Sequence, residues 1–280
     1  MSERWSSAKL LRERGLSPKK SFGQNFLQDA GICERIAELA TTPAGGTVVE
    51  LGAGIGALTA PLSDRAAKVI AVERDRDLVP VLSDLFREAP HVTVLEADAA
   101  QLDLLALLAS GPRPHVIAGN LPYQITGRLI ELSVHAASRI DRAVFMVQRE
   151  VADRLAALPG ADDYGASSVF AQAAFTVERV LKVPAGCFFP PPNVDSAVVL
   201  LTPSVPPRAQ ETRAFQEVVK RAFGQRRKTL RNAWKGLYGW SMEDLDRHAE
   251  HAGIALTARG ETLSVEAFAA MAAEAPQSFR

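Results

Sequence analysis

The segment VVELGAGIGAL, Val48 to Leu58, decides the fold of this chain. It joins a short apolar run, typical of a buried strand, to three glycines at alternate positions, and an amphipathic stretch follows. In open α/β sheets, a glycine turn between a strand and a helix lets a ligand approach the backbone closely. The segment therefore predicts the first strand and helix of a Rossmann-like domain.

The same alternation of apolar runs and amphipathic stretches continues on the C-terminal side of this segment, as far as Gln148. The expected strands are residues 47–51, 68–73, 91–98, 115–120 and 143–148. The expected helices between them are residues 57–66, 76–89, 101–109 and 126–137. This order predicts an α/β fold whose parallel sheet is covered by helices on both faces. Two further strands are expected at 175–183 and 195–203.

A change of pattern marks a second domain. The segment TPSVPPRAQ, residues 202–210, is rich in proline and is typical of a linker. After it the strand patterns stop, and four amphipathic stretches predict helices at 212–224, 228–237, 242–252 and 264–275. We therefore expect a sheet domain over residues 1–204 and a small all-helical domain over residues 205–280.

Composition excludes several classes of protein. The chain has 280 residues, of which 47% are hydrophobic, so it is long and apolar enough for a sizeable core. No run of 18 apolar residues predicts a membrane span, and the N-terminus lacks the apolar core of a signal peptide. A cytoplasmic protein that works as a monomer is expected. Neither Cys33 and Cys187 nor the five histidines have the spacing of metal ligands, so no metal is expected.

Charge is distributed unevenly along the chain. The formal net charge is zero, but the segment from Pro206 to Trp240 holds nine basic residues and only two acidic ones. The first twenty residues hold six basic residues and two acidic ones. Such concentrations of positive charge are typical of a phosphate-binding surface, although a solvated helix face would have the same composition.

Three carboxylates lie at the carboxyl ends of successive expected strands. Glu50 lies near the end of the first strand, just before Gly52 and Gly54, Glu73 ends the second, and Asp98 ends the third. The glycine pattern alone fits NAD, S-adenosylmethionine (SAM) or a tight turn without a ligand. A carboxylate at Glu50 would repel a pyrophosphate but would attract a cationic ligand, and Asp98 offers an acceptor for an adenine amine. Together with Glu73 as the acceptor for two ribose hydroxyls, this pattern favours SAM.

The fourth strand ends in GNLPY, which places Asn120, Leu121, Pro122 and Tyr123 at the same edge of the sheet. The chemistry that needs this group is methylation of an exocyclic amine. The lone pair of adenine N6 is delocalised into the ring, and hydrogen-bond acceptors for both N6 hydrogens would favour a pyramidal, more nucleophilic nitrogen. The Asn120 oxygen and the Leu121 carbonyl would provide them, Pro122 would hold the bend, and Tyr123 would stack on the base. A simple turn is the alternative interpretation.

A flipped base has a second face, and the segment GCFFPPPN offers two rings for it. Phe188 and Phe189 precede three prolines that stiffen the loop. We expect one of these rings to contact the base, although both could belong to the core.

Taken together, the motifs resemble the small-subunit rRNA adenine N6,N6-dimethyltransferases of the KsgA type. The resemblance runs from KKSFGQNFLQD, which begins at Lys19, to TLSVEAF near the C-terminus. The motifs that carry it are ELGAGIGALT, GNLPYQI, MVQREVADRL, FFPPPNVDSAVV and FGQRRKTLRN.

This resemblance implies a SAM-dependent enzyme that transfers two methyl groups to each of two adjacent adenosines in the 3′-terminal hairpin of small-subunit rRNA. It implies a role in the biogenesis of the small ribosomal subunit, and immature subunits as partners. It also places Asn25 and Leu27 in the cofactor pocket with Gly52, Glu73, Asp98 and Asn120. The residues that it implies for RNA contact are Arg226, Arg227, Lys228 and Arg231.

Other functions share part of this pattern. The large-subunit rRNA adenine methyltransferases that confer macrolide resistance have a similar glycine turn, an Asn-Leu/Ile-Pro-Tyr group and the QNF segment, although FFPPPNVDSAVV and FGQRRKTLRN favour the small-subunit type. Protein glutamine and DNA adenine methyltransferases use a related group, from which Leu121 departs. A ribosome-assembly factor with little catalysis would keep the fold, and a nicotinamide dehydrogenase would share only the glycine turn.

Overall fold

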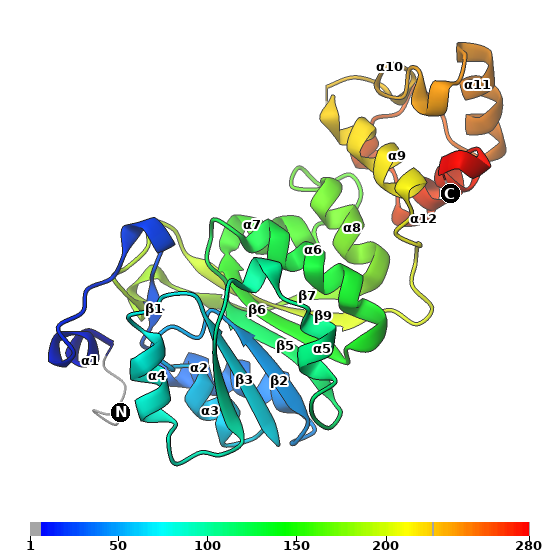
Figure 1. The fold of residues 1–280 in the computed structure, drawn as a ribbon. Coiled ribbons are helices and arrows are strands. Elements are labelled where there is room, and N and C mark those ends of the chain that lie inside the picture. Colours follow the sequence, from blue (N-terminus) through cyan, green and yellow to red (C-terminus); the bar gives the residue numbers. More distant parts are fainter. Residues whose placement is uncertain (1–6, 226, 280) are drawn as a thin grey trace. The chain divides into compact units, whose positions relative to one another are not determined.

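The computed structural model describes residues 7–225 and 227–279. Its main sheet has seven strands in the order β4-β3-β2-β5-β6-β9-β7, and Figure 1 shows helices packed along it. The strands are β2 (Thr47–Leu51), β3 (Lys68–Glu73), β4 (Val92–Glu96), β5 (His115–Asn120), β6 (Arg142–Gln148), β7 (Phe175–Val183) and β9 (Ser196–Pro203). The expected α/β fold with a largely parallel sheet is confirmed.

Five of these strands are parallel to one another, because helices connect them in sequence. β4, β3, β2, β5 and β6 form four parallel pairs, with Val48 of β2 opposite both Val69 of β3 and Val116 of β5. All three valines are fully buried, as expected for strands that are covered on both faces. β9 pairs with β6 in the antiparallel direction, which the sequence pattern did not indicate.

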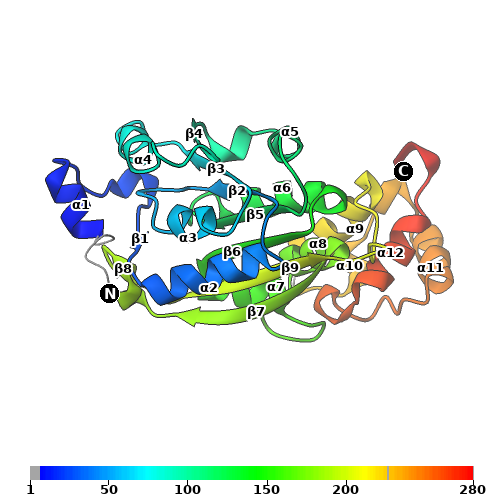
Figure 2. The same cartoon turned by 90° about the horizontal axis from the view of Figure 1, so that it is seen from below.

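The covering helices are shorter than the sequence predicted. α2 begins where the Asp29 side chain accepts a hydrogen bond from the Ile32 N–H, and it packs with α3 on the sheet face that carries Val48 and Val69. α4 packs through Leu82 in one cluster with Ala71 of β3 and Ala60 of α3. Ala71 points to the same face of β3 as Val69, because successive side chains on a strand alternate between faces. Figure 2 shows the strands of the main sheet following one another from β4 to β7. The helices are α1 (Ser7–Glu13), α2 (Ala30–Thr41), α3 (Thr59–Ser63), α4 (Val79–Leu85), α5 (Leu104–Leu108), α6 (Thr126–Ala136) and α7 (Arg149–Ala156).

The strand order reverses between β2 and β5. β3 and β4 follow β2 on one side, whereas β5 and β6 extend the sheet on the other side. At such a switch point the connections that leave the carboxyl ends of the two strands diverge, and a crevice opens between them. The topology therefore favours ligand binding where β2 and β5 end.

The chain forms two compact units. The first holds the chain as far as Ala152 together with Glu178–Pro203, and the second holds Asp153–Val177 together with the chain from Ser204 onward. The second unit thus begins close to the expected boundary at 204/205, but it also takes in a segment that the sequence placed in the sheet domain.

The reason is the packing of this inserted segment, which contains α8. Tyr164 and Val169 are fully buried in one core with Phe215 and Phe268, and the Tyr164 hydroxyl donates to the Leu263 carbonyl at 3.0 Å. The helices of this unit are α8 (Ala166–Ala174), α9 (Arg213–Gly224), α10 (Leu230–Ala233), α11 (Met242–His251) and α12 (Val265–Ala273). Within residues 7–225 and 227–279, no helix has the length and apolar character needed to cross a bilayer.

Candidate functional site

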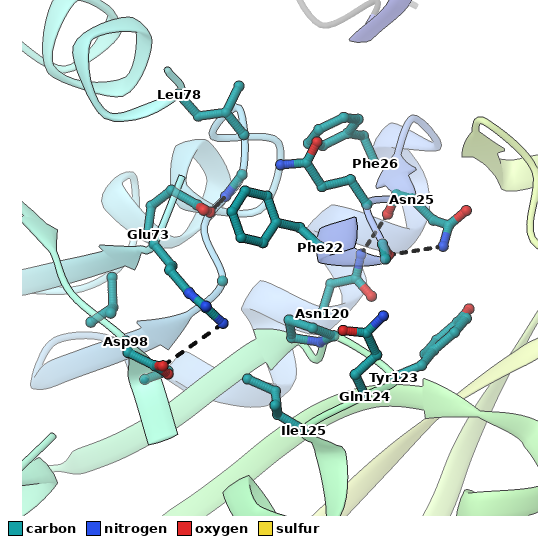
Figure 3. A pocket seen from close by; sticks show the side chains of 18 of the residues that line it. Phe22, Asn25, Phe26, Glu73, Leu78, Asp98, Asn120, Tyr123, Gln124 and Ile125 are labelled. Carbon is teal, nitrogen blue, oxygen red and sulfur yellow. Dashed lines mark hydrogen bonds and ion pairs between the residues drawn. The ribbon is translucent and has the colours of Figure 1, made fainter. Parts of the chain in front are cut away.

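A pocket lies at the carboxyl edge of the parallel strands in the first unit, at the switch point of the sheet (Figure 3). Its lining brings together residues from four strand ends and from a short segment near the N-terminus. They are Phe22–Phe26, Gly52, Gly54, Val72–Arg74, Leu78, Ala97–Ala99, Asn120 and Pro122–Ile125. Most of the residues that the sequence named for a cofactor therefore share one cavity.

The glycine turn after β2 lines this pocket. Gly52 and Gly54 have φ angles of +77° and +59°, a left-handed backbone conformation that residues other than glycine rarely adopt. A Cβ atom on Gly54 would lie 3.2 Å from the Phe26 ring. The turn therefore needs glycine both for its backbone conformation and for the close packing of Phe26.

Glu73, the last residue of β3, is held by main-chain donors. Its carboxylate accepts the Gly54 N–H at 2.7 Å through Oε2 and the Asp75 N–H at 2.7 Å through Oε1. Burial raises the pKa of Glu73, while these hydrogen bonds act in the opposite direction. The carboxylate is thus fixed in orientation, and its remaining lone pairs can accept two hydroxyls from a ligand in the pocket.

Asp98 lies just beyond β4. Its Oδ1 accepts the Ala100 N–H at 3.0 Å, and its Oδ2 is 3.8 Å from the Arg74 guanidinium. Arg74 in turn lies over the Phe22 ring, 5.3 Å from its centroid. Asp98 therefore presents an anionic acceptor to the pocket from the strand next to Glu73.

Asn120, the last residue of β5, is oriented by the N-terminal segment. Its Nδ2 donates to the Asn25 main-chain carbonyl at 3.0 Å, and the Asn25 side chain donates to the Gly23 carbonyl at 3.1 Å. Because the amide nitrogen is directed at Asn25, the Asn120 oxygen is turned away from that carbonyl. The Asn120 oxygen is therefore a hydrogen-bond acceptor with a fixed direction.

The residues after Asn120 form a bend that is anchored at both ends. The N–H of the buried Leu121 donates to the Met146 carbonyl at 3.0 Å, and the Pro122 carbonyl accepts the Ile125 N–H at 3.1 Å. Tyr123 lines the pocket, and its hydroxyl lies 3.0 Å from the Ser196 hydroxyl. Burial raises the pKa of Tyr123, so this phenol stays neutral at physiological pH.

Glu50 and Leu27 lie outside the pocket lining. Glu50 is 1% exposed and accepts a hydrogen bond from the Thr59 hydroxyl at 2.6 Å. Burial raises its pKa to about 7, so it carries only part of a negative charge near neutral pH. The structure thus places Glu50 in the interior with Thr59, where the direct attraction to a cationic ligand expected from the sequence is not seen. Leu27 packs in the core with Cys33 and Ile36.

The two phenylalanines of FFPPPN occupy different environments. They form β8 (Phe188–Phe189), which pairs with β1 (Phe26–Leu27), and successive side chains on a strand point to opposite faces. Phe188 is 2% exposed within the core, so it cannot stack on a base, and its expected catalytic contact is not supported. Phe189 is half-buried and packs against the cluster that contains Phe26 and Leu78.

The basic residues named for RNA contact belong to the second unit. Arg227 and Lys228 are exposed, and Arg231 is exposed and forms an ion pair with Asp246. Arg226, named with them, lies outside the described residues. The described part of the chain holds no group of three His, Cys, Asp or Glu side chains arranged to bind a metal ion.

Sequence reasoning missed several residues of the site. Phe22 and Gln24 line the pocket beside Asn25, and Arg74 lines it beside Glu73. The signal for the first two was their position within KKSFGQNF, and the signal for Arg74 was the charged run ERDRD directly after a buried strand. Neither signal identified a role without the tertiary structure.

The chain is similar to known proteins over nearly its whole length. A family model described as "Ribosomal RNA adenine dimethylase" matches residues 15–277. A protein of Anaeromyxobacter sp. (strain K), named "Ribosomal RNA small subunit methyltransferase A", is 45% identical over 97% of this chain and 98% of its own length. A protein of the same name from Geobacter metallireducens is 42% identical over 93% of this chain and 96% of its own length.

Solved structures are similar as well. A dimethyladenosine transferase from Plasmodium falciparum superposes with a TM-score of 0.75 at 24% identity, covering 88% of this chain and 95% of its own. At that identity the likeness concerns the fold alone. The 23S rRNA methyltransferase ErmE superposes with a TM-score of 0.66 at 27% identity, covering 89% of this chain and 98% of its own.

Proposed function

The chain belongs to the ribosomal RNA adenine dimethylase family, and from this premise we propose how its pocket methylates adenine. The enzyme is a SAM-dependent methyltransferase that acts on rRNA of the small ribosomal subunit. The large-subunit alternative is not supported, because the relatives that are 45% and 42% identical to this chain over nearly its whole length are named for the small subunit.

The pocket fits SAM in its hydrogen-bond acceptors and in its glycine turn. The buried Glu73 carboxylate, held by two main-chain N–H groups, accepts the ribose hydroxyls, and Asp98 accepts the adenine amine. The glycine turn lets the rest of the molecule approach the backbone at Gly52 and Gly54, where side chains would intrude. When bound there, SAM supplies an electrophilic methyl group.

The substrate amine is held at the end of β5. Asn120 Oδ1 accepts one hydrogen of adenine N6, and the Leu121 carbonyl accepts the other. Both bonds favour a pyramidal nitrogen with its lone pair directed into the pocket, which offsets the delocalisation into the ring. After methyl transfer the N6 proton passes to solvent water, so the site needs no general base. Positioning of this kind can lower a barrier by about 7–11 kcal/mol.

Aromatic rings hold the flipped base from its faces. Tyr123 lines the pocket directly after Pro122, and its hydroxyl is fixed by Ser196. Phe189 is the candidate for the opposite face, because it retains exposed surface and packs against the cluster containing pocket-lining Phe26. This assignment separates the two phenylalanines that the sequence could not distinguish.

The finer substrate follows from the family resemblance. We propose two adjacent adenosines of the 3′-terminal hairpin as targets, immature small subunits as the assembled substrate, and a monomeric enzyme in the cytoplasm. Arg227, Lys228 and Arg231 are exposed cations that suit contacts with RNA phosphates. Arg226 carries the same charge.

The single observation that carries the proposal is the hydrogen bond from Asn120 Nδ2 to the Asn25 carbonyl, since it directs the catalytic amide oxygen. The test is to incubate the full chain with methyl-labelled SAM and with small or large subunits from cells that lack this methylation. Mass spectrometry should locate N6,N6-dimethyladenosine at two adjacent positions of small-subunit rRNA. Labelling of the large subunit alone, or of neither, would contradict the proposal.

A further inference from the structure

Asp75 lies two residues beyond Glu73 and is not in the pocket lining, yet it gathers several donors. Its side chain is 3% exposed. The carboxylate accepts Lys19 Nζ at 2.5 Å and Gln24 Nε2 at 2.7 Å, and it also accepts the Asp77 N–H at 3.1 Å. A buried carboxylate that joins two side chains from a distant segment connects the end of β3 to the N-terminal region.

That region, Lys19–Phe26, is folded around this carboxylate. The Lys19 N–H donates to Gln24 Oε1 at 2.7 Å, so the two residues bound to Asp75 are also bound to each other. The Phe22 ring lies between them in sequence, with Lys19 Nζ 5.5 Å from its centroid. Gly23 then turns the chain with a φ of +62°. The segment is thus closed into a compact loop at one wall of the pocket.

The far end of the same loop contacts the catalytic amide. Asn25 offers its carbonyl to Asn120 Nδ2 at 3.0 Å, and Phe26 packs against the glycine turn at Gly54. Figure 3 shows Phe22, Asn25 and Phe26 on one side of the pocket, facing Asn120 and Glu73. The loop therefore has two anchors, Asp75 beside the cofactor strand β3 and Asn120 at the end of β5.

We propose that Asp75 is a positioning residue of this enzyme: by holding Lys19 and Gln24 it fixes the loop Lys19–Phe26, and through the Asn25 carbonyl it fixes the orientation of Asn120. The inference rests on the proposed role of Asn120. Its consequence is that cofactor binding at β3 and amine binding at β5 depend on one loop, although neither Lys19 nor Asp75 lines the pocket.

The charge of Asp75 suits this role. Burial by itself would raise its pKa, but the hydrogen bonds from Lys19 and Gln24 outweigh burial and hold the pKa below its usual value. Hydrogen bonds to Asp75 and then to Asp77 raise the pKa of Lys19. The pair stays ionised around neutral pH, and a charge-assisted bond to a buried group fixes geometry more firmly than a neutral one.

The chain offers a matched control for each partner. Asp77 also lies near Lys19, with Oδ2 2.7 Å from Nζ, but its side chain is 54% exposed. Lys20 is the exposed neighbour of Lys19 and carries the same charge. Asp75→Asn can therefore be compared with Asp77→Asn, and Lys19→Met with Lys20→Met, so that loss of net charge is equal within each pair.

The first measurement is steady-state methylation of small subunits by the four full-length variants. We expect Asp75→Asn and Lys19→Met to lower kcat by about tenfold to a hundredfold, the loss associated with hydrogen bonds to charged groups, and to leave the KM for the subunit within twofold. Both controls should stay within twofold of wild type in kcat. The double variant Asp75→Asn/Lys19→Met should lose no more than the worse single variant, because the two residues act as one unit.

The second measurement does not depend on the reaction. Hydrogen exchange of the protein without ligand should be faster at the amides of residues 20–27 in Asp75→Asn than in Asp77→Asn, with α2 and β5 unchanged. Equal exchange in both, or kcat within twofold of wild type in Asp75→Asn, would overturn the proposal. Lys19→Met, at a residue that does not line the pocket, decides the matter by the same exchange comparison with Lys20→Met if Asp75→Asn does not fold. A wild-type protein that fails to methylate any rRNA would instead refute the proposed function.

Discussion

The Asn120 side chain donates a hydrogen bond to the main-chain carbonyl of Asn25, 3.0 Å away and 95 positions earlier in the sequence. This contact joins the end of β5 to the loop near the N-terminus. It also assigns the two ends of the Asn120 amide, because the nitrogen is used by Asn25 and the oxygen is presented as an acceptor.

Replacing Asn120 by alanine should remove one acceptor for the substrate amine. We expect kcat for rRNA methylation to fall by about a hundredfold to a thousandfold, the loss typical for one preorganised polar group in an active site. SAM affinity, measured by calorimetry, should change by less than fivefold, because Glu73 and Asp98 remain. Full activity in this variant would rule out the mechanism.

The hydrogen bond between Tyr123 and Ser196 should orient the stacking ring. Tyr123→Phe and Ser196→Ala each remove this bond and leave the ring in place, so each should lower kcat by about threefold to tenfold. The double variant should be no slower than the slower single variant, whereas Tyr123→Ala should be much slower. If the two single effects multiply in the double variant, the hydroxyls act independently and the interpretation fails.

Alanine variants of Phe188 and Phe189 should differ in effect: the first should mainly lower stability, and the second should mainly lower activity. Phe188→Ala removes a ring from the core and should lower the free energy of unfolding by about 3–5 kcal/mol in denaturant titrations. Phe189→Ala should cost less stability, since the ring is half-buried, but it should slow methylation of folded protein at least tenfold. The reverse pattern would show that Phe188 is the ring that contacts the base.

Burial of Glu50 should make stability depend on pH. Because its pKa is raised to about 7 in the folded state, the folded protein binds a proton that the unfolded chain has already released. Stability should therefore fall as pH rises from the unfolded pKa near 4.5 to about 7, by up to about 3 kcal/mol, and then stay level. In Glu50→Gln the contribution of Glu50 to this slope should disappear, and the fold should be kept, since glutamine can still accept the Thr59 hydrogen bond. Thermal unfolding of both proteins between pH 5 and 8 measures the difference.

The exposed cations of the second unit should bind phosphate. Arg227→Ala and Lys228→Ala should each raise the KM for the small subunit and reduce the salt dependence of binding by about one unit of log K against log salt. Arg231→Ala should have a smaller effect, because Asp246 already neutralises part of its charge. Arg87→Ala in the first unit, an exposed arginine paired with Glu88, serves as the control. An unchanged salt slope in all variants would argue against phosphate contacts at these positions.

The strands and the glycine turn could be predicted because they are local features. The apolar runs at 47–51, 68–73 and 115–120 became strands with those bounds. Glu73 and Asn120, the last residues of the second and third runs, share one sheet edge because the strands are parallel. The predictions that the structure did not support concerned which side chains are buried. Nothing in the sequence showed that Glu50 turns towards Thr59, or that Phe188 rather than Phe189 enters the core.

By itself, the sequence determined the α/β fold, the glycine turn and the order in which Glu73, Asp98 and Asn120 reach the edge of the sheet. Periodicity and backbone preference act over a few residues and can be recognised without knowing what lies nearby. Only the tertiary structure decided which side chains face the pocket, that residues 153–177 pack with the second unit, and that Asp75 binds Lys19 and Gln24. Such contacts join residues dozens of positions apart, and they form only when the whole chain has brought those residues within hydrogen-bonding distance.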